Sequence, residues 1–212
     1  MGIKERKQRY KEDFRGRILE AAKKLFVQEG IESTSIRKIA KEIEFSPTTI
    51  YLYYKDKSDI VYALHQEGFR ILHQRMEPLV HVGDPFERLK ALGKSYLAFA
   101  IEEPDFYEVL FMKKEPMEFL DNNCIESEWE EGERVFDLLQ HTVRECQQIG
   151  YFQDMDAGLL SLQAWSSVHG LASLFITGHF QKLGEMSDTT VDLDVLLEST
   201  FQVYVVLLEK LR

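Results

Sequence analysis

Cysteine, proline and glycine are scarce: the 212 residues include 2 cysteines, 5 prolines and 12 glycines. The two cysteines, Cys124 and Cys146, cannot build a disulfide framework, and their spacing matches no zinc-binding motif. So little glycine and proline argues against a disordered chain, a collagen-like chain and a turn-rich β-sandwich. The length suffices for one large domain, or for two smaller ones, with a hydrophobic core.

Several sequence signals of function are missing as well. No uninterrupted run of about 18 apolar residues occurs, so we expect no membrane span. Residues 1–17 are charged and lack the apolar stretch of a signal peptide. There is no phosphate-binding loop, serine nucleophile elbow or paired His/Glu zinc motif, and His65, His73 and His81 are not spaced as ligands of one metal. We therefore expect a cytoplasmic protein that is not an enzyme and that takes no cofactor and no metal.

The charge is distributed unevenly along the chain. Residues 1–60 hold 14 Lys and Arg against 10 Asp and Glu, whereas residues 61–212 hold 12 against 26, for a net charge of −10. A basic N-terminal part on an acidic body indicates that only the N-terminal part meets a polyanion. The cations before residue 18, taken alone, are equally typical of the solvated start of a helix.

Apolar residues recur at helical spacing through the first sixty residues. One helix ends at Gly30, a second begins after Thr34 or Ser35, and a third begins at the capping pair Ser46-Pro47 and runs to about Tyr53. The aromatic and β-branched residues 50–54 favour a strand, and hence a winged helix. The Ser-Pro start and the short gap before it favour a helix instead, so we predict a helix–turn–helix.

The rest of the chain also has helical periodicity. The predicted helices are residues 57–77, 85–103, 105–113, 126–149, 156–182 and 191–211, with an aspartate capping pair, Asp56 and Asp59, at the start of the first. We predict an all-α protein with a helix–turn–helix domain at residues 1–60 and a larger helical domain at residues 61–212.

A helix–turn–helix places its second helix in the major groove of DNA. Pro47, Thr48 and Thr49 lie near the tip of this helix and are placed to contact bases, while the hydroxyls of Tyr51 and Tyr53 are suited to phosphates. Lys55 and Lys57 add positive charge next to this helix. We therefore expect double-stranded DNA as a partner.

These residues resemble the DNA-binding domain of the tetracycline-repressor (TetR) family. The resemblance is carried by Gly30, by residues 34–40 (TSIRKIA) and by residues 46–57 (SPTTIYLYYKDK), and it extends without gaps over residues 14–64. It implies a helix–turn–helix over residues 35–54, phosphate contacts from Tyr51 and Lys57, and further contacts from Ser35 and Arg37. Pro47 stands where the family often has lysine, so the base preference of a relative does not transfer.

The resemblance further implies a C-terminal domain that binds a small molecule and forms a homodimer through its last two helices. The composition supports the dimer, because residues 191–211 are apolar nearly all round and must be buried on more than one side. A two-fold dimer implies a pseudo-palindromic operator. The candidate interface residues are Leu174, Leu197, Phe201, Tyr204 and Leu208.

Aromatic residues crowd the middle helices, and they fit either an ordinary core or a pocket for an apolar or amphipathic effector. The candidate pocket residues are Tyr62, Phe69, Tyr96, Phe99, Tyr107, Phe111, Trp129, Trp165 and His169. The segment Trp165–Gly170 resembles the Trp…His-Gly element of one TetR subgroup. His169 is either a core histidine bonded to a neighbour or a ligand contact, and Gly170 is expected to serve a close helix crossing.

The sequence therefore predicts a homodimeric, ligand-responsive DNA-binding regulator, most simply a repressor. Two alternatives stay open: a constitutive DNA-binding protein without an effector, and a small-molecule-binding protein whose DNA-binding part is degenerate.

Overall fold

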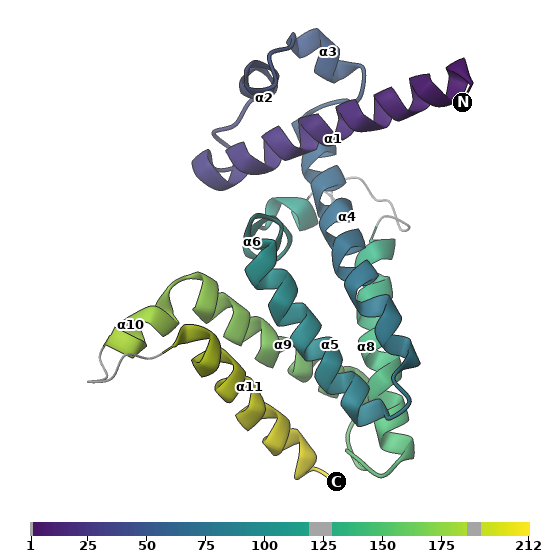
Figure 1. Cartoon of the computed structure of the whole chain (residues 1–212), viewed down its shortest axis with the longest axis vertical. Coiled ribbons are helices and arrows are strands. Elements are labelled where there is room, and N and C mark those ends of the chain that lie inside the picture. Colours follow the sequence, from purple (N-terminus) through teal and green to yellow (C-terminus); the bar gives the residue numbers. More distant parts are fainter. Residues whose placement is uncertain (1, 119–128, 186–191) are drawn as a thin grey trace. The chain divides into compact units, whose positions relative to one another are not determined.

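The computed structural model (Figure 1) describes residues 2–118, 129–185 and 192–212. Within these ranges every regular element is helical, which confirms the predicted all-α class. By its internal contacts the chain divides into two compact units. The first unit comprises residues 1–69 and 105–129, and the second comprises residues 70–104 and 130–212. The expected domain boundary after residue 60 stays a prediction.

Three helices build the N-terminal part of the first unit: α1 (Ile3–Glu29), α2 (Ile36–Glu42) and α3 (Pro47–Tyr51). Two serines cap α2 and α3 as predicted: the Ser35 Oγ accepts the backbone N–H of Lys38 (3.3 Å), and the Ser46 Oγ accepts that of Thr49 (3.2 Å). Residues 52–54 follow α3 as a turn, so the strand alternative is excluded.

The turn between α2 and α3 is made at Glu44, which has a positive φ of 60°. The N–H of Phe45 donates to the carbonyl of Ala40 (2.9 Å) and the N–H of Glu44 to that of Lys41 (3.1 Å), the hydrogen bonds of a Schellman motif. This turn lets α3 bury its Ile50 in the three-helix core, whose other members include Phe14, Ile18, Phe26, Ile36, Ile39 and Ala40.

The first unit also contains the start of α4 (Lys57–Met76). Its N-terminus has the predicted aspartate pair, since Asp56 accepts the N–H of Asp59 (2.9 Å) and Asp59 accepts the N–H of Lys55 (2.9 Å). Glycine at position 68 allows a close helix contact, because a methyl group there would overlap the side chain of Leu110.

Leu110 belongs to a distant segment of the chain that the first unit includes. Residues 104–112 form α6 (Pro104–Tyr107) followed by the π-helical turn η2 (Glu108–Met112), where one short helix was expected. Phe106 of this segment lies beneath the Lys23 ammonium of α1, 4.2 Å from Nζ to the ring centroid. The segment therefore packs against both α1 and α4.

In the second unit, α5 (Pro85–Glu102), α8 (Glu130–Gln148) and α9 (Ala157–Ile176) pack together. Here α9 also contacts α10 (His179–Glu185) and α11 (Leu193–Glu209), which contact each other. The 3₁₀ turn η1 (Glu77–His81) precedes α5. Buried Arg88 of α5 pairs with Glu145 of α8 and donates to the carbonyl of Val82, so one cation joins two helices and the preceding loop.

The prediction of a single helix over residues 156–182 is wrong. Gly178 has a φ of 77°, a left-handed conformation that ends α9, and α10 begins at the next residue. The hydroxyl of Thr177 donates to the Ser173 carbonyl and completes the helix end (2.6 Å). Sequence periodicity continues across this break, which is why it was missed.

By length and composition α9 is apolar enough to cross a membrane, although it holds no uninterrupted run of about 18 apolar residues. It contains no charged residue, and its serines, glutamine and histidine only interrupt the apolar run. The core helix of a soluble protein passes the same test. Only 28% of the apolar 18-residue window of α9 is buried within the chain, although α9 contacts α5, α8 and α11.

Candidate nucleic-acid interface

One face of α3 is held in the core and the other is open. Ile50 is fully buried, and the Ser46 cap and Pro47 fix where the helix starts. Thr48 is exposed, and the side chain of Tyr51 is 56% exposed. This open face is the one that a helix–turn–helix directs at base edges and phosphates.

The neighbouring polar groups of α3 are more constrained. Thr49 is half-buried, and its hydroxyl lies 2.9 Å from that of Ser46. Tyr53 is half-buried too, with its ring centroid 4.9 Å from that of Phe14. Thr48 and Tyr51 are therefore the most accessible of the predicted contacts on this helix, and Tyr53 is anchored by its ring.

The predicted contacts outside α3 fall into two kinds. Ser35, Arg37 and Lys55 are exposed, as a phosphate contact requires. Lys57 is half-buried instead, and its ammonium donates to the backbone carbonyls of Ile31 (2.8 Å) and Glu32 (3.3 Å). Lys57 thus ties the start of α4 to the turn after α1, a structural role that no sequence pattern indicated.

Sequence reasoning missed one accessible residue beside α3. Leu52 is 74% exposed, which is unusual for a leucine in an ordered turn. An apolar side chain at this position is suited to the methyl group of thymine.

Five of the candidate pocket residues lie in the first unit, and four of these form an aromatic cluster centred on Phe69. Its ring centroid lies 5.5 Å from that of Phe111 and 6.1 Å from that of Trp129, and Tyr107 lies 5.3 Å from Phe111. The fifth, Tyr62, is half-buried on α4. The cluster thus joins α4 to the η2 segment.

His65 belongs to this cluster, although the sequence did not single it out as a pocket residue. It is 1% exposed and its ring lies 4.9 Å from that of Phe69. Among the residues that the structure describes, neither ring nitrogen has a hydrogen-bond partner, and the same holds for the Trp129 Nε1. Burial lowers the pKa of His65 to about 4, so the ring is neutral at ordinary pH.

The other four candidates lie in the second unit. The Tyr96 hydroxyl and the His169 Nδ1 are 3.1 Å apart, and Trp165 packs near the His169 ring. Burial lowers the pKa of His169. The pair gives the half-buried His169 a partner within the chain, and both interpretations of this residue stay open. Phe99 is fully buried, so it contributes packing.

The five residues expected at a dimer interface divide between core and surface. Leu197, Phe201 and Leu208 are buried within their own chain, with Phe201 packed where Gly93 leaves room. Of the other two, Leu174 is 43% exposed and Tyr204 is half-buried. Burial raises the pKa of the Tyr204 hydroxyl to about 12. Gly170 makes no close helix contact within the described residues, because a methyl group there would meet nothing within 4 Å, so its expected role in a close helix crossing stays a prediction.

Metal and redox chemistry receive no support from the described residues. In residues 2–118, 129–185 and 192–212, no three His, Cys, Asp or Glu side chains are grouped as metal ligands. Burial raises the pKa of the Cys146 thiol to about 12, which makes it unreactive. Cys124 lies outside the described residues.

Comparison with known families gives two matches. Residues 18–64 match the family described as bacterial regulatory proteins, tetR family, and residues 89–198 match the tetracyclin repressor-like C-terminal domain. An HTH-type transcriptional regulator of Staphylococcus aureus (strain USA300) is 46% identical over 57 residues. That match covers 27% of this chain and 31% of the relative's length, and a regulator of strain N315 gives the same values.

Solved structures resemble most of the chain. The fatty acid degradation regulator FadR from Bacillus halodurans is 21% identical, with a TM-score of 0.68 over 90% of this chain and 94% of that one. The TetR family transcriptional regulator PfmR from Thermus thermophilus is 19% identical, with a TM-score of 0.65 over 89% of this chain and 97% of that one. At these identities the likeness concerns the fold.

Proposed function

Because the chain belongs to the TetR family of DNA-binding transcriptional regulators, we propose that it is a cytoplasmic, homodimeric repressor that a small amphipathic effector releases from its operator. The family is one of regulators and not of enzymes. The observation that carries the proposal is the α3 helix, which Ile50 anchors in the core while Thr48, Tyr51 and Leu52 stay exposed.

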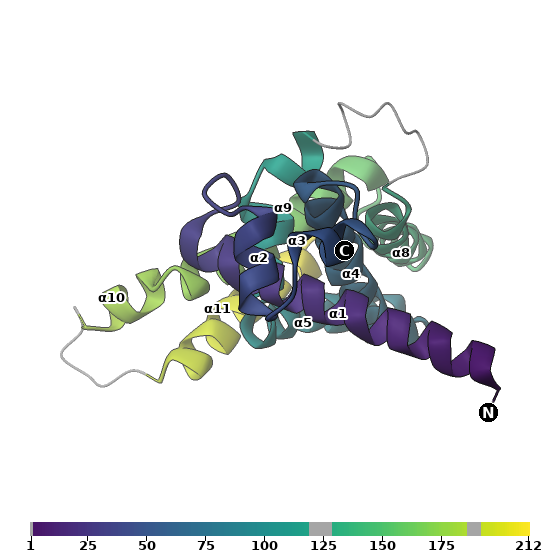
Figure 2. The ribbon, with the colours of Figure 1, turned by 90° about the horizontal axis from the view of Figure 1, so that it is seen from above.

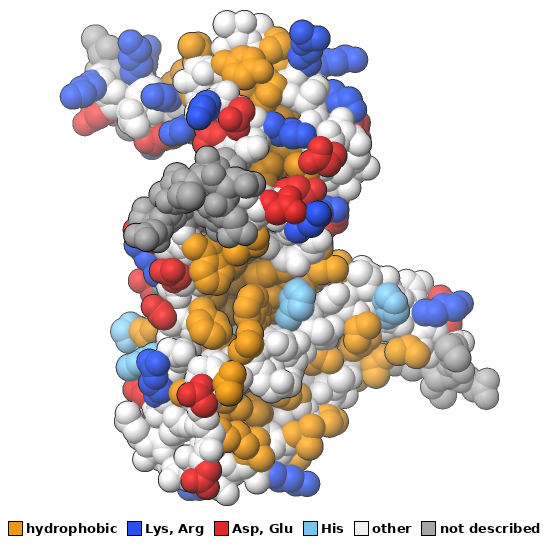
Figure 3. Space-filling view, turned by 180° about the vertical axis from the view of Figure 1, so that it is seen from behind, with side chains coloured by type: hydrophobic (Ala, Val, Ile, Leu, Met, Phe, Trp, Pro, Cys, Tyr) orange, Lys and Arg blue, Asp and Glu red, His pale blue; other side chains and the backbone are white. Residues whose placement is uncertain are grey.

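Exposed apolar residues on α9 and α11 support the homodimer. Leu162 and Leu174 on α9, and Val203, Val206 and Leu207 on α11, are each more than 40% exposed. The two helices contact each other (Figure 1), and Figure 3 shows hydrophobic side chains at the surface of the second unit. Pairing this surface with its copy about a two-fold axis would remove it from water.

The polar residues of α9 do not oppose such burial. The hydroxyls of Ser166 and Ser167 donate to the carbonyls of Leu162 (2.7 Å) and Gln163 (2.9 Å) in their own helix. Their donors are therefore satisfied without water, and the open space beside Gly170 would let a partner helix come close. The sequence placed the buried residues Leu197, Phe201 and Leu208 of α11 at the interface. The interface proposed here uses the exposed residues Val203, Val206 and Leu207 of the same helix instead.

The unpartnered polar groups beside Phe69 support an amphipathic effector over a purely apolar one. His65 and the Trp129 Nε1 would gain hydrogen bonds from a ligand head group, while the aromatic rings pack against its apolar part. Since both Phe69 and His65 are on α4, a ligand bound here acts on this helix. We propose that it shifts α4 and spoils the spacing of the two DNA-binding parts.

Selection of bound duplexes from a random DNA library tests the regulator. A pseudo-palindrome whose half-sites fit a two-fold dimer is expected. No enriched sequence, with only weak salt-sensitive binding, would contradict the proposal and favour a ligand-binding protein with a degenerate DNA-binding part.

A constitutive DNA-binding protein is the second candidate, favoured by the Tyr96–His169 bond, which gives these polar groups a partner within the chain. A thermal-shift screen against a metabolite panel separates the two, because an effector at 100 times its dissociation constant adds about 2.7 kcal/mol. A ligand that saturates the protein without changing its DNA affinity would contradict ligand-controlled release.

A further inference from the structure

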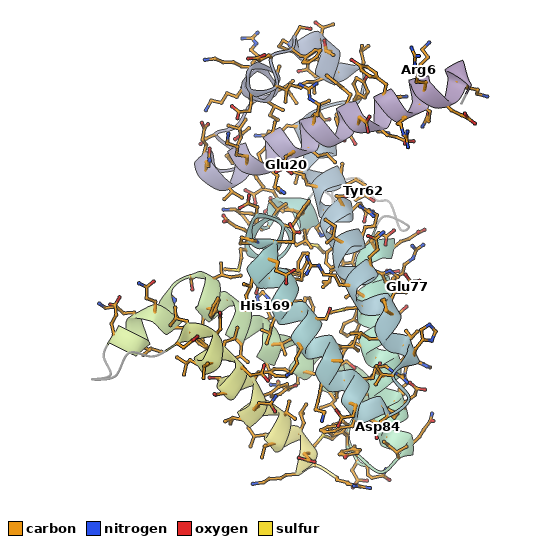
Figure 4. All side chains as sticks on the ribbon, in the orientation of Figure 1. Arg6, Glu20, Tyr62, Glu77, Asp84 and His169 are labelled. Atoms are coloured by element: carbon orange, nitrogen blue, oxygen red, sulfur yellow. The ribbon has the colours of Figure 1, made fainter. Side chains whose placement is uncertain are left out.

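The first part of α1 lies ahead of the segment that matches the family. That match begins at residue 18, whereas α1 begins at Ile3 and is helical throughout. Residues 4–13 are all exposed. Figures 1 and 2 show this end of α1 extending past α2 and α3, and Figure 4 labels Arg6 within it.

The charges on this segment are sorted by face. At 3.6 residues per turn, Lys4, Lys7, Lys11 and Arg15 fall within about 80° of one another around the helix. The same face, continued along α1, carries the buried Phe14 and Ile18 of the core. Glu5 and Glu12 fall outside this arc. We call Lys4, Lys7, Lys11 and Arg15 the basic face of α1.

The stability of the helix does not account for this arrangement. Neighbours three or four positions apart on the basic face carry like charges, which destabilises a helix. Cations near the N-terminus also oppose the helix dipole. Lys4, Lys7 and Lys11 form no ion pair or hydrogen bond with any residue in the described ranges.

Arg15 joins the basic face to the DNA-binding helix. Its guanidinium donates to the carbonyl of Tyr53 (3.4 Å) and lies 5.4 Å from the ring centroid of Tyr54, so this face begins beside the end of α3. From Lys4 to Arg15 the helix rises about 16 Å. A duplex covers that distance in about five base-pair steps.

We infer that the basic face of α1 binds the phosphate backbone of double-stranded DNA next to the bases that α3 contacts. The inference rests on the proposed DNA binding and adds a contact surface outside the matched helix–turn–helix. Its contacts are independent of base sequence, so the face contributes affinity and salt dependence, and not base preference.

Two double variants of the full chain test this, because they remove the same charge from different faces of one segment. Lys7→Gln/Lys11→Gln removes two cations from the basic face, and Arg6→Gln/Arg9→Gln removes two from elsewhere on the helix. Glutamine has nearly the helix propensity of lysine and arginine, and circular dichroism checks that helicity is kept. Affinity is measured from about 50 to 200 mM salt, on the selected operator and on a random duplex of equal length.

The basic-face variant is expected to lower the salt slope by about 1.8 per DNA-binding part, because each phosphate that is no longer neutralised lowers it by about 0.9. Across that fourfold salt range the wild type then loses about 12-fold more affinity per DNA-binding part than the variant. The Arg6/Arg9 variant keeps the wild-type slope, and Lys7→Arg/Lys11→Arg keeps both slope and affinity.

Equal effects of the two charge-removing variants, or none from either, overturn the inference while DNA binding itself stands. Binding of the basic face to anionic phospholipid vesicles, with DNA affinity unchanged by its loss, overturns it in favour of a membrane surface. If the wild type binds neither duplex, it is the proposed function that fails.

Discussion

Replacing His65 with leucine is expected to change how the stability of the protein depends on pH. The ring is buried against Phe69, and burial lowers its pKa from 6.5 to about 4. Because the folded pKa lies below the unfolded one, only the unfolded chain binds a proton at this site between those values. The contribution of His65 is therefore intact above about pH 6.5 and is lost as pH falls towards about 4.

The magnitude follows from the size of that pKa gap. At about 1.36 kcal/mol for each pH unit, the wild type loses about 3 kcal/mol across this window through His65. The His65→Leu variant lacks this loss. At neutral pH it is also expected to be more stable by about 1 kcal/mol, because a buried polar ring without a partner is replaced by an apolar side chain.

Urea unfolding at about pH 7, 6 and 5 measures the effect, with the protein concentration held constant because the proposed dimer would dissociate on unfolding. The difference between wild type and variant isolates His65 from carboxylates that titrate in both proteins. His81→Gln, at an exposed histidine, is the matched control and should follow the wild type.

A wild-type-minus-variant difference that stays constant from pH 7 to 5 would refute the reasoning, since the ring would then titrate alike in both states. A variant that is less stable at neutral pH would show that the imidazole makes a favourable hydrogen bond after all.

Four further changes test other parts of the molecule. Tyr51→Phe should weaken binding to every duplex by a similar factor and leave the salt slope unchanged in a filter-binding titration, because a neutral hydroxyl neutralises no phosphate; unchanged affinity would remove Tyr51 from the phosphate contacts. Lys57→Ala should lower the unfolding free energy by about 1 kcal/mol because its hydrogen bonds to backbone carbonyls are removed, so wild-type stability in urea would contradict the structural role. Gly68→Ala should cost about 1–3 kcal/mol because the new methyl group overlaps Leu110; a melting temperature equal to wild type would show that this contact is loose. Val206→Glu, at an exposed position on α11, should halve the mass found by light scattering and leave helicity intact, and an unchanged mass would exclude this dimer surface.

Sequence signals were strongest where short-range chemistry decides the conformation. Ser35, Ser46 and the pair Asp56 and Asp59 start their helices because their side-chain oxygens satisfy nearby backbone N–H groups. The residues involved are only three positions apart, so the pattern is visible in the printed sequence. The same local signals identified the helix–turn–helix, which contains the most accessible candidate residues.

Local signals failed where a boundary depends on backbone conformation or on distant partners. Gly178 ends α9 through a left-handed φ, although the apolar spacing continues beyond it. The π-helical turn η2 and the close contact between Gly68 and Leu110 join segments about forty residues apart, and no periodicity reports such a contact.

The sequence by itself determined the helical class, the starts of the first helices and the basic N-terminal part, because capping, periodicity and charge are local properties. Only the tertiary structure decided which residues of the apolar helix α11 are exposed, that Lys57 is held by carbonyls of Ile31 and Glu32, and that His65 is buried with no hydrogen-bond partner in the described part of the chain. Burial and hydrogen bonding between distant residues depend on how the helices pack, and packing depends on side chains that are far apart in the sequence.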